Sequence, residues 1–220
     1  NPLARDKGTI RKKNSNSIEL IDKSPVRKSM KYIVLILSFI TLQLYAQTGN
    51  QALVMGNVER LCLPDSKLVI RDTLPDSLDS FNSIFLFSNS TSFLTADDVI
   101  KIDSFVVKGG GLYNGSDNWP LQAEANQMTQ KLYRKESFGN YEEEIAKSGE
   151  AGNLDLEELD TIPAGKTTSA FPMDYRLKVE AWVADQPLIL SGHHGNGRIV
   201  IDTGYSRFYC DMRDENTDAV

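Results

Sequence analysis

The stretch FVVKGGGLYNGSDNWPLQAEANQMTQKLY, residues 105–133, decides the fold of this chain. Its first residues complete an amphipathic helix, and three glycines then lead into a short buried strand, Gly111–Asn114. A polar loop, Gly115–Trp119, follows, and we expect a second helix to begin at Pro120, because proline suits the first helical position. In open α/β sheets ligands bind where strands end and helices begin, so any chemistry is expected in Gly115–Asn118.

The segments before this stretch alternate between strands and a helix. Short apolar runs predict three strands, at residues 52–55, 67–71 and 83–88. The third run is apolar enough to be buried on both faces, as in a parallel sheet. Thr95 and Asp98 have the spacing of a capping box that opens a helix. The order of these elements predicts an α/β domain with a three-layer, doubly wound, mainly parallel sheet.

The pattern changes after the second predicted helix. Residues 134–173 mix acids with Gly, Ser and Pro, which indicates an excursion over one sheet edge with a solvated acidic face rather than a calcium loop. Two apolar runs, 188–190 and 198–201, flank a loop that contains Asn196-Gly197, a strong hairpin signal. We therefore expect antiparallel strands near the C-terminus. Because doubly wound domains usually add a closing helix, we interpret the domain as truncated at Val220.

The first 46 residues are expected to lie outside the folded domain. Residues 30–46, MKYIVLILSFITLQLYA, combine a positive charge, an apolar core and a cleavage site, as in a secretory signal peptide. The apolar run is shorter than the about 20 residues of a membrane span, and the alternative is an uncleaved anchor. Residues 1–29 are expected to be a disordered or spurious leader. Residues 47–220 would then form one domain, exported to the periplasm or secreted.

Composition narrows the function classes. The net charge is -6, and the basic residues after residue 47 are interspersed with acids, so no nucleic-acid partner is expected. The sequence has no metal-binding cluster and no glycine-rich phosphate motif, so we expect no metal and no cofactor. Cys62 and Cys210 either form a disulfide or are two separate small buried residues.

Two segments carry a family resemblance. The first combines the buried strand IFLFSNS (84–90), a helix opened by LTADDV (94–99), the triple glycine and the tight turn that ends at Trp119. It resembles the class I glutamine amidotransferase-like superfamily, which implies a flavodoxin-like α/β fold from about Ala52 to the end of the chain. The run LSGHHGNGRIVIDTGYSRF (190–208) resembles the late hairpin of non-catalytic or trehalose-utilisation-type members.

The resemblance also implies where catalysis would occur. In catalytic members a cysteine lies on a strained turn between a strand and a helix, and a histidine with an acidic partner follows a late strand. Ser116 stands in the cysteine position, and His193 or His194 approximates the histidine, but no acid follows the histidines. We therefore prefer a non-catalytic binding or interaction domain. A secreted hydrolase that uses Ser116 with His193 or His194 is the alternative.

Polar residues at the strand ends are the candidate ligand-binding residues. They are Asn114, Asp117, Asn118, His193, Tyr205 and Arg207. Arg207 would bind an anion or form a surface ion pair. The simpler interpretations are a helix-capping turn at Ser116–Asn118, an exposed hairpin tip at the histidines and core packing of Trp119. The partner is expected to be an unknown small molecule or an envelope protein, with membrane contact only through an uncleaved signal segment.

Overall fold

The computed structural model describes residues 51–63, 67–142, 145–148, 154, 161–165 and 167–212. The predicted leader and signal peptide lie outside the described residues, and so do residues 143–144, 149–153, 155–160 and 166 of the acidic stretch. No helix within the described ranges is long and apolar enough to cross a membrane. The strands are β1 (Gln51–Gly56), β2 (Leu68–Ile70), β3 (Phe81–Phe87), β4 (Gly111–Gly115), β5 (Phe138–Tyr141), β6 (Ile145–Ser148), β7 (Thr161–Pro163), β8 (Thr168–Ala170), β9 (Leu177–Val183), β10 (Gln186–His194) and β11 (Gly197–Asp202). The helices are α2 (Ala96–Val107), α3 (Ala123–Tyr133) and the 3-10 helices η1 (Tyr205–Phe208) and η2 (Cys210–Met212).

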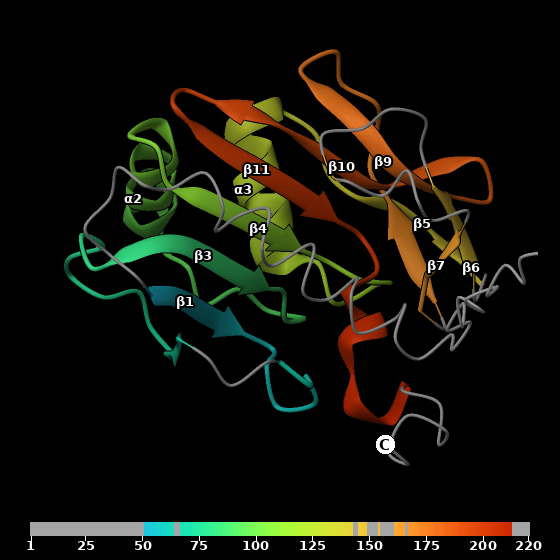
Figure 1. Cartoon of the computed structure of the whole chain (residues 1–220), viewed down its shortest axis with the longest axis horizontal. Coiled ribbons are helices and arrows are strands. Elements are labelled where there is room, and N and C mark those ends of the chain that lie inside the picture. Colours follow the sequence, from blue (N-terminus) through green and yellow to red (C-terminus); the bar gives the residue numbers. More distant parts are fainter. Residues whose placement is uncertain are drawn as a thin grey trace, which may run out of the picture.

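Nine of these strands form one sheet, in the order β2-β1-β3-β4-β11-β10-β9-β6-β7 (Figure 1). The first five strands in this order are parallel, and the others pair antiparallel. The order 2-1-3-4, with β11 in fifth place, is that of flavodoxin-like sheets. The prediction of an α/β fold around a parallel sheet with late antiparallel strands is therefore confirmed. Strands β5 and β8 form a separate two-stranded sheet.

The first half of the chain forms its elements where the local patterns predict them. All seven residues of β3 are buried, as expected of a strand with parallel neighbours on both sides. The capping box of α2 is complete. The hydroxyl of Thr95 accepts from the N–H of Asp98 at 3.1 Å, and the carboxylate of Asp98 accepts from the N–H of Thr95 at 2.9 Å. These two bonds fix the start of α2 at the predicted residue.

The second helix starts later than predicted. It begins at Ala123, while Pro120 lies in a turn after a cis peptide bond to Trp119. In this turn the N–H of Leu121 donates to the carbonyl oxygen of Asn118 at 2.9 Å. Trp119 is 76% exposed. The prediction that it packs in the core is therefore wrong, because the turn keeps it off the buried face of α3.

Two hydrophobic cores lie on opposite faces of the sheet. One joins β1, β3 and β4 to the buried faces of α2 and α3. The other joins the opposite face of the same strands to Tyr205, Phe208 and Tyr209 near the C-terminus. The ring of Tyr205 lies 5.5 Å from that of Phe87, and the ring of Phe208 lies 6.2 Å from that of Tyr113. Among the described residues, both α-helices thus cover one face, and an aromatic segment takes the place of the predicted second helical layer.

Candidate functional site

Four strands of the parallel half of the sheet end along one edge, which we call the carboxyl edge. These strands are β1, β3, β4 and β11. The segments that follow them meet there. The N–H of Ser88 donates to the carbonyl oxygen of Gly115 at 2.9 Å, and the N–H of Ser116 donates to that of Asp202 at 2.7 Å. Gly115–Asn118 therefore lies at the edge where α/β sheets bind ligands, as the sequence predicts.

A buried ion pair follows β11. Nη1 of Arg207 donates to both carboxylate oxygens of Asp202, at 2.8 and 2.9 Å, and Nη2 reaches Oδ1 at 2.8 Å. The guanidinium also donates to the carbonyl oxygens of Pro163 and Gly204. Its side chain is only 5% exposed. Arg207 therefore forms neither the predicted anion site nor a surface ion pair, because its donors are turned inward onto Asp202 and two carbonyl groups.

Tyr113, on β4, forms a hydrogen bond with the carboxylate of this ion pair. Its hydroxyl donates to Oδ2 of Asp202 at 2.6 Å. Burial, followed by the charge of Asp202, raises the pKa of Tyr113 well above its usual value, so the hydroxyl stays protonated. The carboxylate of Asp202 thus has partners on two elements and is held inside the protein.

Asp117 is a second buried carboxylate at the carboxyl edge. Its oxygens accept from the N–H of Asn118 at 2.7 Å and from the N–H of Ser206 at 2.6 Å. Burial raises the pKa of Asp117 from 3.8 to about 6, since the lost hydration outweighs these hydrogen bonds. The carbonyl oxygen of Asp117 accepts from the hydroxyl of Ser169 at 2.9 Å. Asp117 therefore ties the loop after β4 to the segment after β11.

Tyr205 fills the point between β1 and β3. Its hydroxyl donates to the carbonyl oxygen of Ser88 at 2.7 Å and accepts from Nδ2 of Asn57 at 2.9 Å. Gly56 allows the end of β1 to lie close to the end of β3. Its φ is +97°, and a Cβ atom there would lie 1.8 Å from the carbonyl oxygen of Phe87. In sheets of this strand order, the β1/β3 position is the switch point that receives a ligand. Here the fully buried side chain of Tyr205 lies there instead.

Ser116 and the two histidines lie at opposite edges of the sheet. Ser116 follows the last residue of β4, whereas His194 pairs with Gly197 at the start of β11. Because β11 runs parallel to β4, its start is level with the start of β4, and the five residues of β4 span about 15 Å. Nε2 of His194 lies 2.6 Å from Oδ1 of Asp103 on α2. The dyad required by the hydrolase alternative, with either His193 or His194, is therefore not assembled.

The other predicted polar residues of the carboxyl edge also bond within the chain. These bonds join Nδ2 of Asn114 to the carbonyl oxygen of Ala125 (3.2 Å), Nδ2 of Asn118 to that of Trp119 (3.3 Å) and Oγ of Ser116 to Oγ of Ser137 (3.2 Å). His193 is exposed at the end of the hairpin, as the hairpin-tip interpretation predicts. The structure thus gathers all of the predicted site residues except the histidines at the carboxyl edge. Asn118 is half-buried there, and the side chains of the others are buried.

Asn57, Ser88 and Glu124 are among the residues at this edge that the sequence analysis does not assign to a site. Glu124 is buried at the start of α3, where it accepts from the N–H groups of Asn89 at 2.7 Å and Phe93 at 3.3 Å. The helix dipole favours an acidic residue in the first turn of a helix, so the presence of Glu124 there does not by itself indicate that it is buried. The partners of all three come from distant segments, so no local pattern indicates them.

A groove of about 550 Å³ lies between α2 and α3. Its lining combines small or apolar side chains with amides and two charged residues: Ala96, Val99, Ile100, Ala123, Asn126, Gln127, Gln130, Lys131 and Glu136. This volume is within the range of small-molecule pockets, about 300–1,000 Å³. In the part of the chain that the structure describes, no group of three or more His, Cys, Asp or Glu side chains is placed to hold a metal ion.

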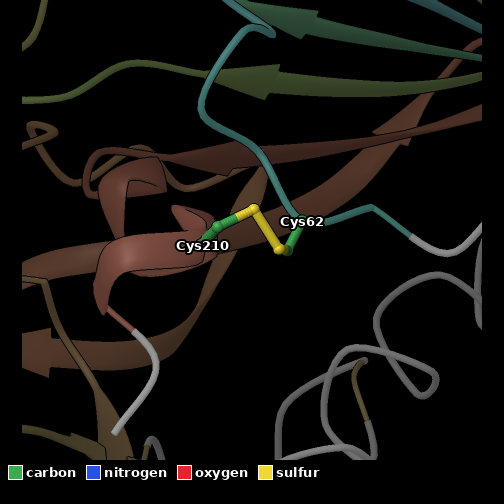
Figure 2. The surroundings of a disulfide bond; sticks show 2 residues. All are labelled: Cys62 and Cys210. Atoms are coloured by element: carbon green, nitrogen blue, oxygen red, sulfur yellow. A yellow bond between two sulfur atoms is a disulfide. The ribbon is translucent and has the colours of Figure 1, made fainter. Parts of the chain in front are cut away.

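Cys62 and Cys210 form a disulfide, with an S–S distance of 2.07 Å (Figure 2). The bond joins the loop after β1 to η2, across 148 positions of sequence. Of the two interpretations of the cysteines, the structure therefore shows the disulfide. Bonds of this kind persist in oxidising compartments.

No protein-family model matches the chain, and no curated protein matches it. Several solved structures are similar. Cytoplasmic protein STM1381 from Salmonella typhimurium LT2 has a TM-score of 0.53 at 11% identity, over 70% of this chain and 87% of its own. Cytoplasmic protein STM3548 from Salmonella typhimurium has a TM-score of 0.50 at 14% identity, with the same two coverages of 70% and 87%. A putative ThuA-like protein from Bacteroides uniformis ATCC 8492 has a TM-score of 0.48 at 9% identity, over 76% of this chain and 86% of its own.

These similarities concern the fold alone, because the sequence identities are low. The two Salmonella structures share the α/β architecture over most of their length.

Proposed function

We propose that residues 47–220 form an exported, non-catalytic binding or interaction domain with a class I glutamine amidotransferase-like fold. The flavodoxin-like order of the parallel strands supports the fold assignment. The observation that carries the non-catalytic proposal is the position of Ser116 and His194 at opposite edges of the sheet. A serine nucleophile needs an oriented base within hydrogen-bond reach.

The chemistry of the carboxyl edge supports the same proposal. Asp202, Arg207 and Asp117 are bound by groups of their own chain. A ligand would have to break these bonds inside the protein. We therefore place the proposed small-molecule site in the groove between α2 and α3, where an apolar wall of α2 faces amides of α3. An envelope protein is the alternative partner.

Two features support export. The segment 30–46 has the composition of a signal peptide. The disulfide between Cys62 and Cys210 fits the periplasm or the extracellular space better than a reducing cytosol. The proposed route is translation from Met30, cleavage after Ala46 and oxidation of the two cysteines.

Binding is tested by measuring Tm of the purified oxidised protein against a panel of small polar and amphipathic molecules. A ligand of the groove raises Tm of the wild type and not of Ile100→Glu, because the new charge enters the groove. Ile70→Glu is the matched control, since Ile70 on β2 is 51% exposed and Ile100 is 52% exposed. A panel without any shift favours an envelope protein as partner. Turnover of a panel compound that Ser116→Ala abolishes contradicts the proposal.

Export is tested by expressing the chain from Met30 in a bacterial host and fractionating the cells. We expect a periplasmic or secreted protein whose mass corresponds to Gln47 as the first residue and to two oxidised cysteines. Deleting residues 32–40 should keep it in the cytosol. An uncleaved cytosolic protein with free thiols contradicts export.

A further inference from the structure

Two segments cross at the outer side of the switch point and are joined there. They are residues 58–62, after β1, and residues 209–211, after η1, and together we call them the clasp. Leu61 and Tyr209 form an antiparallel bridge. The N–H of Cys62 donates to the carbonyl oxygen of Phe208 at 2.9 Å, and the N–H of Cys210 donates to that of Arg60 at 2.8 Å. Figure 2 shows the disulfide spanning the two segments.

Tyr209 is 4% exposed and packs in the core together with Leu61, whereas the polar side-chain contacts that join the two segments are weak. The guanidinium of Arg60 lies 4.2 Å from the centroid of the Tyr209 ring and pairs with the carboxylate of Asp211. The side chains of this ion pair are 55% and 60% exposed, and exposed pairs contribute little to stability. The covalent bond between the cysteines is therefore the strong link of the clasp.

The clasp covers polar atoms at the switch point. The ring of Tyr209 packs against that of Tyr205, with centroids 5.9 Å apart. Its hydroxyl lies 3.5 Å from Nδ2 of Asn57, which in turn donates to the hydroxyl of Tyr205. Nδ2 of Asn57 and the two tyrosine hydroxyls can all form hydrogen bonds with a polar ligand. These three groups lie at the switch point, where sheets with this strand order bind a ligand.

We propose that the Cys62–Cys210 disulfide is a redox latch that holds the clasp closed over the switch point, and that a dithiol reductant opens it and exposes Asn57 and Tyr205. The proposal goes beyond the binding function and does not depend on the ligand. Cys210 is exposed and Cys62 is half-buried, so we expect the reductant to attack Cys210. The class of partner is a protein with a Cys-x-x-Cys dithiol.

The disulfide is reduced in two steps of thiol–disulfide exchange. One thiolate of the reductant attacks Sγ of Cys210, the S–S bond breaks, and Cys62 leaves as a thiolate. The second thiol of the reductant then displaces Cys210. The clasp gains two electrons and two protons, and the reductant is oxidised to its own disulfide.

Opening is confined to the clasp because the residues beneath it are anchored separately. Tyr205 is held by the carbonyl oxygen of Ser88, and Arg207 by the carboxylate of Asp202. Phe208 packs in the core against Tyr113. These contacts need no disulfide, so reduction removes the covalent link between residues 58–62 and 209–211 and loosens their pairing while the sheet stays folded.

The test is backbone hydrogen exchange of the full chain, oxidised and after treatment with a phosphine reductant. We expect the amides of Cys62, Tyr209 and Cys210 to exchange on the order of tenfold faster after reduction, while β4 stays protected over the same time window. The double variant Cys62→Ser/Cys210→Ser should match the reduced wild type and should not respond to the reductant.

Three outcomes overturn the proposal. Equal exchange of the clasp amides in the oxidised and reduced protein shows that the bond does not hold the clasp. Fast exchange that spreads equally into β1, β3 and β4 shows a general stabilising bond instead of a latch. Two free thiols in the untreated exported protein show that there is no latch to open.

Discussion

The hydroxyl of Tyr205 donates a hydrogen bond to the carbonyl oxygen of Ser88 at 2.7 Å, across 117 positions of sequence. The same hydroxyl accepts from Nδ2 of Asn57, so one side chain after β11 links the segments that follow β1 and β3. The side chain of Tyr205 thus fills the crevice that binds a ligand in other sheets with this strand order. The carboxyl edge therefore contributes to folding stability through its own polar contacts.

Removing this hydroxyl should destabilise the protein. In Tyr205→Phe the buried carbonyl oxygen of Ser88 and the amide of Asn57 both lose a partner, and we expect a loss of about 1–3 kcal/mol in the free energy of unfolding. Urea denaturation measures this loss in the free energy of unfolding. Tyr175→Phe is the control, because Tyr175 is 95% exposed and should change stability by less than about 0.5 kcal/mol. Equal losses in the two variants contradict a stabilising role for the Tyr205 hydroxyl.

Asp117 should make stability fall as the pH rises. Its pKa is about 6 in the folded protein and 3.8 in the absence of burial, so between these values the folded protein binds the proton more tightly than the unfolded chain. The free energy of unfolding should drop by about 3 kcal/mol from this group between about pH 4 and pH 7. Urea denaturation across this pH range measures the change.

Asp117→Asn isolates this effect. The amide does not ionise, so the variant should gain about 3 kcal/mol relative to the wild type over the same pH range. It also loses one acceptor for the N–H of Asn118 or Ser206, at a cost of about 1–3 kcal/mol that does not depend on pH. Parallel stability curves for the wild type and the variant show that burial does not perturb Asp117.

The buried pair between Arg207 and Asp202 should show strong coupling. Arg207→Met leaves a buried carboxylate without its countercharge, and we expect a loss of about 3–5 kcal/mol. Adding Asp202→Asn removes that charge and keeps an oxygen that accepts from Tyr113, so the double variant should be more stable than Arg207→Met alone. Chemical denaturation of the wild type, the two single variants and the double variant gives the coupling energy. A double variant less stable than the single one contradicts a buried charge pair.

Local sequence patterns predict much of the fold. The apolar runs locate β1, β3 and β4, Thr95 and Asp98 locate the start of α2, and Asn196-Gly197 locates the hairpin of β10 and β11. The sequence places the start of α3 at Pro120, which is too early. Proline is common both in turns and in the first turn of a helix, so the local pattern does not distinguish the two. No local pattern predicts the aromatic layer on the sheet face opposite the helices, because that layer depends on long-range packing of Tyr205 and Phe208.

The sequence predicts the candidate site less well. It places Ser116 and Asp117 at a strand end and the histidines at a hairpin tip, as the structure has them, but it does not show that the tip and Ser116 lie at opposite edges of the sheet. The hairpin tip precedes β11, and β11 runs parallel to β4, so the tip must lie at the amino edge. Only the strand pairing reveals this. The partners Asn57 and Ser88 are invisible locally because Tyr205 reaches them from the far end of the described chain.

The non-catalytic character of the carboxyl edge is tested most directly by incubating the folded protein with a fluorophosphonate, which labels serine nucleophiles activated by a base, and measuring its intact mass. Ser116 has a hydroxyl of Ser137 at 3.2 Å and no histidine beside it, so the mass should remain that of the untreated protein. A single adduct that maps to Ser116 and disappears in Ser116→Ala would contradict this result and establish a hydrolase.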